Sequence, residues 1–308
     1  MALGPTPVSP WHRSAFVILI CRPPRNRFGP RSGRSGCAAA PLEPGAFVLT
    51  LTITAALVDK VRDIALRAGV EILKIYNSDF AVQHKDDASP VTEADYRAEK
   101  LIIAAIRTEI TDALPFVAEE TAAAGDIPDV GDQPFWLIDP LDGTKQFVKR
   151  QGEFTVNIAL IVGGRPQLGA VHAPAINATY WASEYGAFAV TDDGPAHAIA
   201  CRPVPEKGVI ALASRSHRNS ETEAFLARYD VAEVISSGSS IKFCLIATGR
   251  ADLYPRTGRT MEWDTAAGHA VVRFAGGSVT DMAGRELLYG KPGFENPHFV
   301  VKGAERTR

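Results

Sequence analysis

The sequence predicts an α/β protein in which helices and sheets are stacked in layers. Two observations predict this class: apolar residues recur at helical spacing in several segments, and strand-like apolar runs bounded by turn residues fill the intervals between them. Because a one-sided helix and a one-sided sheet each need a partner surface, this alternation favours helix layers packed on sheet layers. A chain of 308 residues has room for one large domain or two subdomains.

Residues 1–50 differ from the rest of the chain. They carry six arginines and one acidic residue, whereas residues 51–308 carry 27 basic and 34 acidic residues. The short apolar run at 15–21 lacks the flanks of a signal peptide, and an organellar transit peptide is a weaker alternative. We expect residues 1–50 to be a disordered extension or the product of a misplaced start site. The domain proper is then 51–308.

The first half of this domain contains two predicted helices and a run of strands. The first helix covers 54–76, and the second begins at Thr92, which forms a capping box with Asp95. The predicted strands are 116–118, 135–138, 154–162, 166–172, 179–185 and 188–191. The first of these strands ends at Glu119 and Glu120, before a loop.

The polar, proline-containing stretch 192–208 predicts a boundary between two subdomains, of about 51–195 and 196–308. Helices and strands alternate again beyond it. The predicted strands are 209–213, 231–236 and 251–255, the predicted helices are 221–229, 241–248 and 265–274, and a terminal β segment follows.

Composition excludes several classes of function. The formal net charge of −2 argues against a general nucleic-acid-binding protein, which would normally be basic. The four cysteines have no metal-binding or disulfide spacing, so a reducing cytoplasm is the simpler expectation. No apolar run reaches the roughly 18 residues needed to cross a bilayer.

The most informative motif is WLIDPLDGT at 136–144. Asp139 and Asp142 follow a buried strand, and two carboxylates this close repel each other unless a cation lies between them. Carboxylate and carbonyl oxygens are the ligands that Mg²⁺ selects. Gly143 and Thr144 offer backbone N–H groups, which commonly bind phosphate. One segment therefore indicates both a divalent metal and a phosphate.

Three further acidic positions have ordinary explanations as well. By themselves, Glu119 and its neighbour would be explained as a solvated pair. A functional role is better supported because a second acidic strand end follows about twenty residues later. Asp264 is explained by capping the next helix, and Asp95 by its capping box. Capping is compatible with a role at a metal site, so both interpretations stay open.

Basic and hydroxyl residues in the second half suggest where a phosphate binds. Lys242 lies close to the serine-rich turn 236–240, and this combination suits a phosphate better than a lysine that only snorkels at the surface. Ser214 and His217 flank an arginine after a predicted strand, which suits a polyanionic ligand, although a lone histidine is more often structural.

The order of these motifs resembles the Mg²⁺-dependent, lithium-sensitive phosphatase superfamily that includes inositol monophosphatases and fructose-1,6-bisphosphatases. The motifs are EE at 119–120, DPLDGT at 139–144 and WD at 263–264. More narrowly, the segments at 89–95, 144–147, 214–217, 238–244 and 263–270 resemble 3′(2′),5′-bisphosphate nucleotidases of the CysQ type. The resemblance covers nearly all of 51–300. It departs at Ala118, where many relatives have Gly or Ser, and this small residue should be neutral.

The resemblance implies a layered αβαβα sandwich with two subdomains, and two or three Mg²⁺ ions. The implied metal ligands are Glu119, Asp139 and the Leu141 carbonyl for the first ion, Asp139, Asp142 and Asp264 for the second, and Glu119, with Asp95 nearby, for the third. Thr144 with Glu119 or Asp95 would orient the attacking water. The implied substrate contacts are Glu119, Leu141, Asp142, Gly143, Thr144, Ser214, His217, Ser239, Lys242 and Asp264.

The activity implied by the resemblance is hydrolysis of the 3′-phosphate of adenosine 3′,5′-bisphosphate to AMP and phosphate by metal-activated water, in support of sulfate assimilation. A cytoplasmic enzyme without a stable protein partner is expected, with peripheral contact to the inner membrane left open. The alternatives are an inositol monophosphatase or broad sugar-phosphate phosphatase, and a non-catalytic phosphonucleotide-binding protein.

Overall fold

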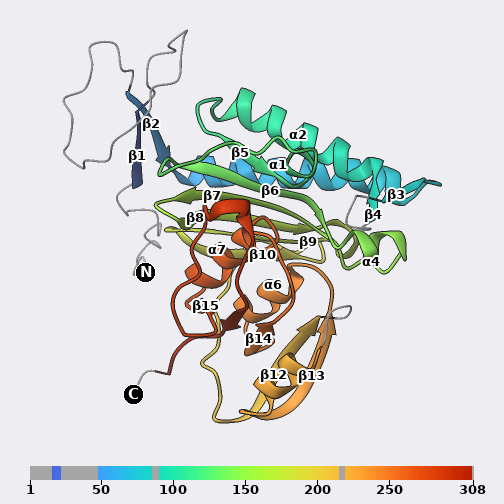
Figure 1. The fold of residues 1–308 in the computed structure, drawn as a ribbon, viewed down its shortest axis with the longest axis vertical. Helices are drawn as coiled ribbons and strands as arrows, with labels where there is room; N and C mark the ends of the chain where they lie inside the picture. The colour runs from blue at the N-terminus through green and yellow to red at the C-terminus, as the bar shows by residue number, and fades with distance from the viewer. Residues whose placement is uncertain (1–15, 22–47, 85–89, 215–218, 307–308) are drawn as a thin grey trace, which may run out of the picture.

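The computed structural model describes residues 16–21, 48–84, 90–214 and 219–306. The α-helices in these ranges are α1 (Ala55–Tyr76), α2 (Glu93–Glu109), α3 (Glu119–Ala123), α4 (Thr144–Val148), α5 (Ser220–Leu226), α6 (Ile241–Ala247) and α7 (Ala266–Phe274). Figure 1 shows α1 and α2 above a large sheet and α6 and α7 beneath it. In the ranges described, no helix is both long and apolar enough to span a bilayer.

The large sheet has seven strands. Their order across the sheet is β11 (His197–Ala198), β10 (Gly186–Thr191), β9 (Ala178–Ser183), β8 (Arg165–Ala173), β7 (Thr155–Val162), β6 (Phe135–Asp142) and β5 (Phe116–Ala118). Neighbouring strands are antiparallel except for β5 and β6, which run parallel. The carboxyl ends of β5 and β6 therefore meet at the same edge of the sheet.

The upper helix layer packs on one face of this sheet through an apolar stripe. On α1, Val61, Ile64, Ala68 and Ile72 recur every three or four residues and are fully buried, as helical periodicity predicts. They belong to one apolar cluster with Trp136, which β6 contributes from the upper face of the sheet. This packing holds α1 and α2 rigidly above the strands that carry the acidic motifs.

Small residues let α7 approach its neighbours closely from below. A Cβ atom added at Gly169 on β8 would lie 2.6 Å from the Ala267 carbonyl oxygen of α7. A Cβ atom added at Gly268 would lie 2.5 Å from the Phe243 ring of α6. The small residues that follow the WD motif are therefore needed for close packing of the middle layer.

A second, five-stranded sheet lies below α6 and α7. Its strand order is β13 (Asp230–Ser237), β12 (Lys207–Ser214), β14 (Leu253–Arg256), β16 (Phe299–Lys302) and β15 (Ser278–Asp281). Its residues alternate between two cores: Tyr254 and Phe299 belong to the cluster that includes α6 and α7, whereas Leu253 and Val300 pack with Leu226 of α5. The predicted αβαβα sandwich is confirmed.

A two-stranded antiparallel sheet joins part of residues 1–50 to the domain. It consists of β1 (Phe16–Cys21) and β2 (Val48–Ile53), and Ile18 is 3% exposed within the same apolar cluster as α1. Residues 16–21 and 48–50, nine residues of the predicted extension, therefore lie in strands, which composition did not predict. The other residues expected to form a disordered extension lie outside the described residues, and the subdomain boundary stays a prediction.

The structure differs from the predicted elements near the sheet edge. Glu119 and Glu120 do not precede a loop but begin α3, and β6 continues past Ile138 to Asp142. Pairing with β7 resumes at Asp142. The proline of the motif does not prevent this, because it lies where the ladder is interrupted and so removes no ladder hydrogen bond. Between α1 and α2, where no strand was predicted, the chain forms β3 (Val82–His84) and β4 (Pro90–Thr92).

Candidate active site

The acidic residues of the predicted site lie where β5 and β6 end. Because these strands run parallel, Glu119 and Asp139 follow neighbouring positions at the same sheet edge. The β6–β7 ladder is interrupted between Asp139 and Asp142, so the motif bends there. In this bend, the Leu141 N–H donates to Asp139 Oδ1 at 3.0 Å.

A glycine with a left-handed backbone turns the chain from β6 into α4. Gly143 has φ 93°, and a Cβ atom at this position would lie 2.8 Å from the Glu153 carbonyl oxygen. Only glycine combines this conformation with this close approach at little cost. The turn places Thr144 Oγ1 3.2 Å from the Leu141 carbonyl oxygen and 3.3 Å from Asp95 Oδ1.

Asp95 both caps α2 and reaches the site. Its Oδ2 atom accepts hydrogen bonds from the Thr92 N–H and hydroxyl, each at 2.8 Å, which forms the predicted capping box. Its Oδ1 atom faces the Thr144 hydroxyl. The buried carboxylate therefore caps α2 and also contacts Thr144, whereas its role at a metal site stays a prediction.

Asp264 does not cap α7. The N-cap position is Thr265, which makes no side-chain capping bond, and Asp264 Oδ2 instead accepts the Met261 N–H at 2.9 Å. The expectation of an N-cap aspartate is therefore wrong by one residue. The reason is that the segment before α7 forms a turn closed on Met261, and this turn brings Asp264 to the pocket.

The acidic side chains perturb one another. Burial, followed by the charges of Glu119, Asp142 and Asp264, raises the pKa of Asp139 well above its ordinary value. Desolvation of Asp142, partly offset by Lys242, raises its pKa to about 6. The pKa of Asp264 is raised by desolvation and then by the charge of Asp142. Together these side chains form a site of concentrated negative charge.

This donor set fits a hard divalent cation. In the part of the chain that the structure describes, no three His, Cys, Asp or Glu side chains are already arranged to hold a metal ion. The candidate ligands are nevertheless all carboxylate or carbonyl oxygens, the donors that Mg²⁺ and Ca²⁺ prefer. The mutual repulsion that raises the carboxyl pKa values is what a cation would relieve.

Lys242 lies opposite these acids, at the start of α6. Its side chain is 4% exposed, and its ammonium donates to the Ser237 carbonyl oxygen at 3.2 Å and to the Ser239 carbonyl oxygen. It lies 5.3 Å from the centre of the Tyr254 ring. Burial lowers the pKa of Lys242 to about 8, although the charge of Asp142 acts in the opposite direction.

Arg256, at the end of β14, is a second cation on the same side. It is 8% exposed, and its Nη2 donates to the Arg259 carbonyl oxygen at 3.1 Å. Within the described ranges its Nε atom is buried without a hydrogen-bond partner. A buried guanidinium with a spare donor is suited to an anion. We call Lys242 and Arg256 the basic wall, and Glu119, Asp142 and Asp264 the acidic wall.

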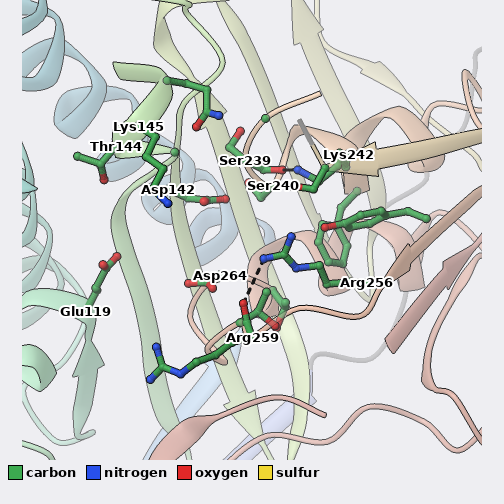
Figure 2. A pocket seen from close by; sticks show the side chains of 18 of the residues that line it. Glu119, Asp142, Thr144, Lys145, Ser239, Ser240, Lys242, Arg256, Arg259 and Asp264 are labelled. Atoms are coloured by element: carbon green, nitrogen blue, oxygen red, sulfur yellow. Dashed lines mark hydrogen bonds between the residues drawn. The ribbon is translucent and has the colours of Figure 1, made fainter. Parts of the chain in front are cut away.

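The two walls line one cavity of about 220 Å³, which Figure 2 shows from close by. Of the residues expected from the sequence, the lining includes Glu119, Asp142, Gly143, Thr144, Ser214, Ser239, Lys242 and Asp264. Asp95, Asp139 and Leu141 support the lining through the contacts above. His217 lies outside the described residues.

Several lining residues escaped the sequence analysis. They are Lys145, Tyr254, Arg256, Arg259 and Thr260. The sequence did contain a signal for the two arginines. Residues 51–308 are acidic overall, and Arg256 and Arg259 are only three positions apart, shortly before the WD motif. Two cations in an acidic domain, next to a metal motif, indicate an anion-binding wall.

Comparison with known proteins gives a consistent result. Residues 55–305 match the inositol monophosphatase family. The 3′(2′),5′-bisphosphate nucleotidase CysQ of Escherichia coli (strain K12) is 43% identical over 248 residues, which cover 80% of this chain and 99% of that protein. The solved structure of CysQ from Bacteroides thetaiotaomicron has a TM-score of 0.68 and 37% identity, covering 82% of this chain and 98% of that one. The Thermotoga maritima IMPase has a TM-score of 0.66 and 28% identity, covering 80% and 92%.

Proposed function

The chain belongs to the inositol monophosphatase family, and from this premise we propose that it removes the 3′-phosphate of adenosine 3′,5′-bisphosphate. The products are AMP and inorganic phosphate, so the enzyme is a 3′(2′),5′-bisphosphate nucleotidase. Similarity supports this branch of the family, because identity is 43% to the CysQ nucleotidase and 28% to the Thermotoga maritima IMPase.

The observation that carries the proposal is the pairing of an acidic and a basic wall in one cavity. A phosphate monoester needs the acidic wall, with its cations, for charge neutralisation during phosphoryl transfer. A second phosphate needs a separate cationic surface, and buried Lys242 and Arg256 supply it. A substrate with one phosphate would leave the charge of this desolvated basic wall only partly compensated, by backbone carbonyl oxygens.

Mg²⁺ is the cation we propose for the acidic wall. Glu119, Asp139 and the Leu141 carbonyl would hold one ion, and Asp139, Asp142 and Asp264 a second. A third, weaker ion would use Glu119. When bound, such ions lower the pKa of a water molecule and stabilise the departing alkoxide. Lithium sensitivity would follow from competition at one of these positions.

The chain's own groups orient the reactants. The Thr144 hydroxyl, which contacts Asp95 Oδ1 and the Leu141 carbonyl, would accept a hydrogen bond from the attacking water and so orient it. The backbone N–H groups of Gly143 and Thr144 would bind the scissile phosphate. No side-chain nucleophile is required, and the pKa of buried Cys201 is raised to about 12 by desolvation, which makes its thiol inert.

The remaining substrate contacts involve the basic side of the cavity. Ser214, Ser239 and Lys242 would contact the nucleotide and its second phosphate, with His217 as a further contact. Arg256 joins this group because its partly unpaired guanidinium is buried at the same wall. In the cell, removal of the bisphosphate by-product would support sulfate assimilation, as a cytoplasmic reaction.

The test is phosphate release by the purified full-length chain in Mg²⁺. Adenosine 3′,5′-bisphosphate and inositol 1-phosphate are compared, each with and without lithium. We expect a kcat/KM at least about 100-fold higher for the bisphosphate, and inhibition by lithium. Preference for inositol 1-phosphate would overturn the substrate but keep the metal site. No release from either compound would favour a non-catalytic binding protein.

A further inference from the structure

Glu99 of α2 does not line the cavity, and its side chain forms hydrogen bonds with another helix, α3. Its side chain is buried, with 6% exposed, and its Oε2 atom accepts the Glu120 N–H at 2.7 Å. Its Oε1 atom accepts the Thr121 N–H at 2.9 Å and also bonds the Thr121 hydroxyl. All three donors belong to the first turn of α3, which begins at Glu119.

These bonds replace a local cap that α3 lacks. The N-cap residue is Ala118, which has no side-chain acceptor, so the first N–H groups of α3 depend on another element. Burying a carboxylate is costly unless several hydrogen bonds compensate, and here three do. A serine or aspartate at position 118 could cap the helix without a buried charge from α2. Capping alone therefore explains the arrangement poorly.

The position of Glu99 on α2 links it to the second half of the site. Asp95 and Glu99 are four residues apart, so they lie one turn apart on the same face of this helix. Asp95 contacts the Thr144 hydroxyl, and Glu99 holds the segment that begins with Glu119. One buried helix face thus fixes the spacing between the two segments.

We propose that Glu99 is a positioning residue that aims Glu119 at the metal site. By fixing the backbone of α3, it holds the Glu119 carboxylate on the cavity wall, where Figure 2 shows it on the same side as Asp142 and Asp264. Glu99 then sets the affinity for the divalent cation and has little effect on nucleotide binding at the basic wall. The proposal rests on the proposed metal-dependent function, but not on the identity of the organic substrate.

The decisive measurement is Mg²⁺ binding to the metal-free, full-length protein by titration calorimetry. We expect Glu99→Gln, which keeps the size but places an amide N–H₂ against backbone donors, to raise the Mg²⁺ dissociation constant about 10-fold or more. The KM for the bisphosphate at saturating Mg²⁺ should stay within about twofold of wild type, and excess Mg²⁺ should restore most of kcat.

Two controls separate positioning from stability. Glu93→Gln makes the same chemical change at an exposed position of α2, and should leave Mg²⁺ affinity unchanged. Leu226→Ala removes a buried side chain of α5, in the lowest core, so it should lower Tm without weakening Mg²⁺ binding.

The outcomes distinguish this proposal from the proposed function. If wild type binds Mg²⁺ and cleaves the bisphosphate, but Glu99→Gln binds Mg²⁺ within twofold of wild type, the positioning role is wrong and the nucleotidase stands. The positioning role would also be wrong if Leu226→Ala raised the Mg²⁺ dissociation constant as much as Glu99→Gln does. A wild-type protein that does not bind Mg²⁺ would overturn both. Cleavage of inositol 1-phosphate instead would change the substrate but leave the Glu99 test valid.

Discussion

The acidic and basic walls of the cavity are held in place in different ways. Glu119 follows β5 and Asp142 ends β6, the neighbouring strand of the large sheet, so backbone pairing forces these like charges together. Lys242 and Arg256 come from α6 and β14, in the layers below, and each donates to backbone carbonyl oxygens. The acidic wall is therefore strained by repulsion, whereas the basic wall is already partly satisfied.

This difference indicates which property of the enzyme each wall controls. Repelling carboxylates gain most from a cation, so removing one should affect the chemical step itself. Partly satisfied cations gain less from an anion, so removing one should affect the choice of substrate. The first wall would then determine whether the reaction occurs, and the second which phosphate ester is used.

The largest effect is expected from Asp142→Asn. Loss of this carboxylate removes a ligand of the second proposed ion, and kcat should fall by about 10³-fold or more. The fold should survive, because the desolvation cost of the buried carboxylate outweighs its attraction to Lys242, so Tm in Mg²⁺-free buffer should not decrease. Phosphate release and thermal unfolding are measured together, with exposed Asp132→Asn as the matched control. Near-normal turnover would contradict the metal assignment.

A smaller, selective effect is expected from Lys242→Ala. Loss of the ammonium should reduce kcat/KM for adenosine 3′,5′-bisphosphate about 30- to 100-fold, since a buried charged hydrogen bond is worth about 2–3 kcal/mol. Hydrolysis of a monophosphate should change less than about fivefold. Lys242→Met, which keeps more of the packing, is the second variant. Equal losses on both substrates would remove Lys242 from substrate selection.

The smallest effect concerns stability at alkaline pH. Burial lowers the pKa of Lys242 from 10.5 to about 8, so between these values the unfolded chain binds more protons than the folded one. The contribution of Lys242 to the free energy of unfolding should therefore increase as pH rises from 8 to 10, by about 2 kcal/mol. Urea unfolding of wild type and Lys242→Met at pH 7, 8, 9 and 10, without Mg²⁺, isolates this contribution. Parallel pH profiles of the two proteins would show that Lys242 stays charged.

The acidic wall was predictable because its residues are contiguous or follow strand signals. The DPLDGT motif places two carboxylates, a glycine turn and Thr144 within six residues, so local sequence alone brings them together. The basic wall was only half predictable. Lys242 follows a serine-rich turn that signals phosphate binding, whereas Arg256 looks like any strand-end arginine until β14 is placed beside α6.

Several single residues also have long-range contacts that local sequence does not predict. The capping box of Thr92 and Asp95 was visible from spacing, but the second contact of Asp95, to Thr144, spans 49 positions of the chain. Local sequence does not single out Glu99, because its partners lie on α3, more than twenty residues later. Asp264 was expected to cap α7, yet it bonds backward to Met261.

By itself, the sequence determined the alternation of helices and strands, the limits of most elements, and the chemistry of the acidic motif. These depend on periodicity, turn residues and neighbours within a few positions, which are local properties of the chain. Only the tertiary structure decided that Glu119 begins a helix capped by Glu99, that β6 continues to Asp142, and that Arg256 is buried opposite the acids. The physical reason is that burial and long-range hydrogen bonding arise when layers pack, and both depend on residues far apart in the chain.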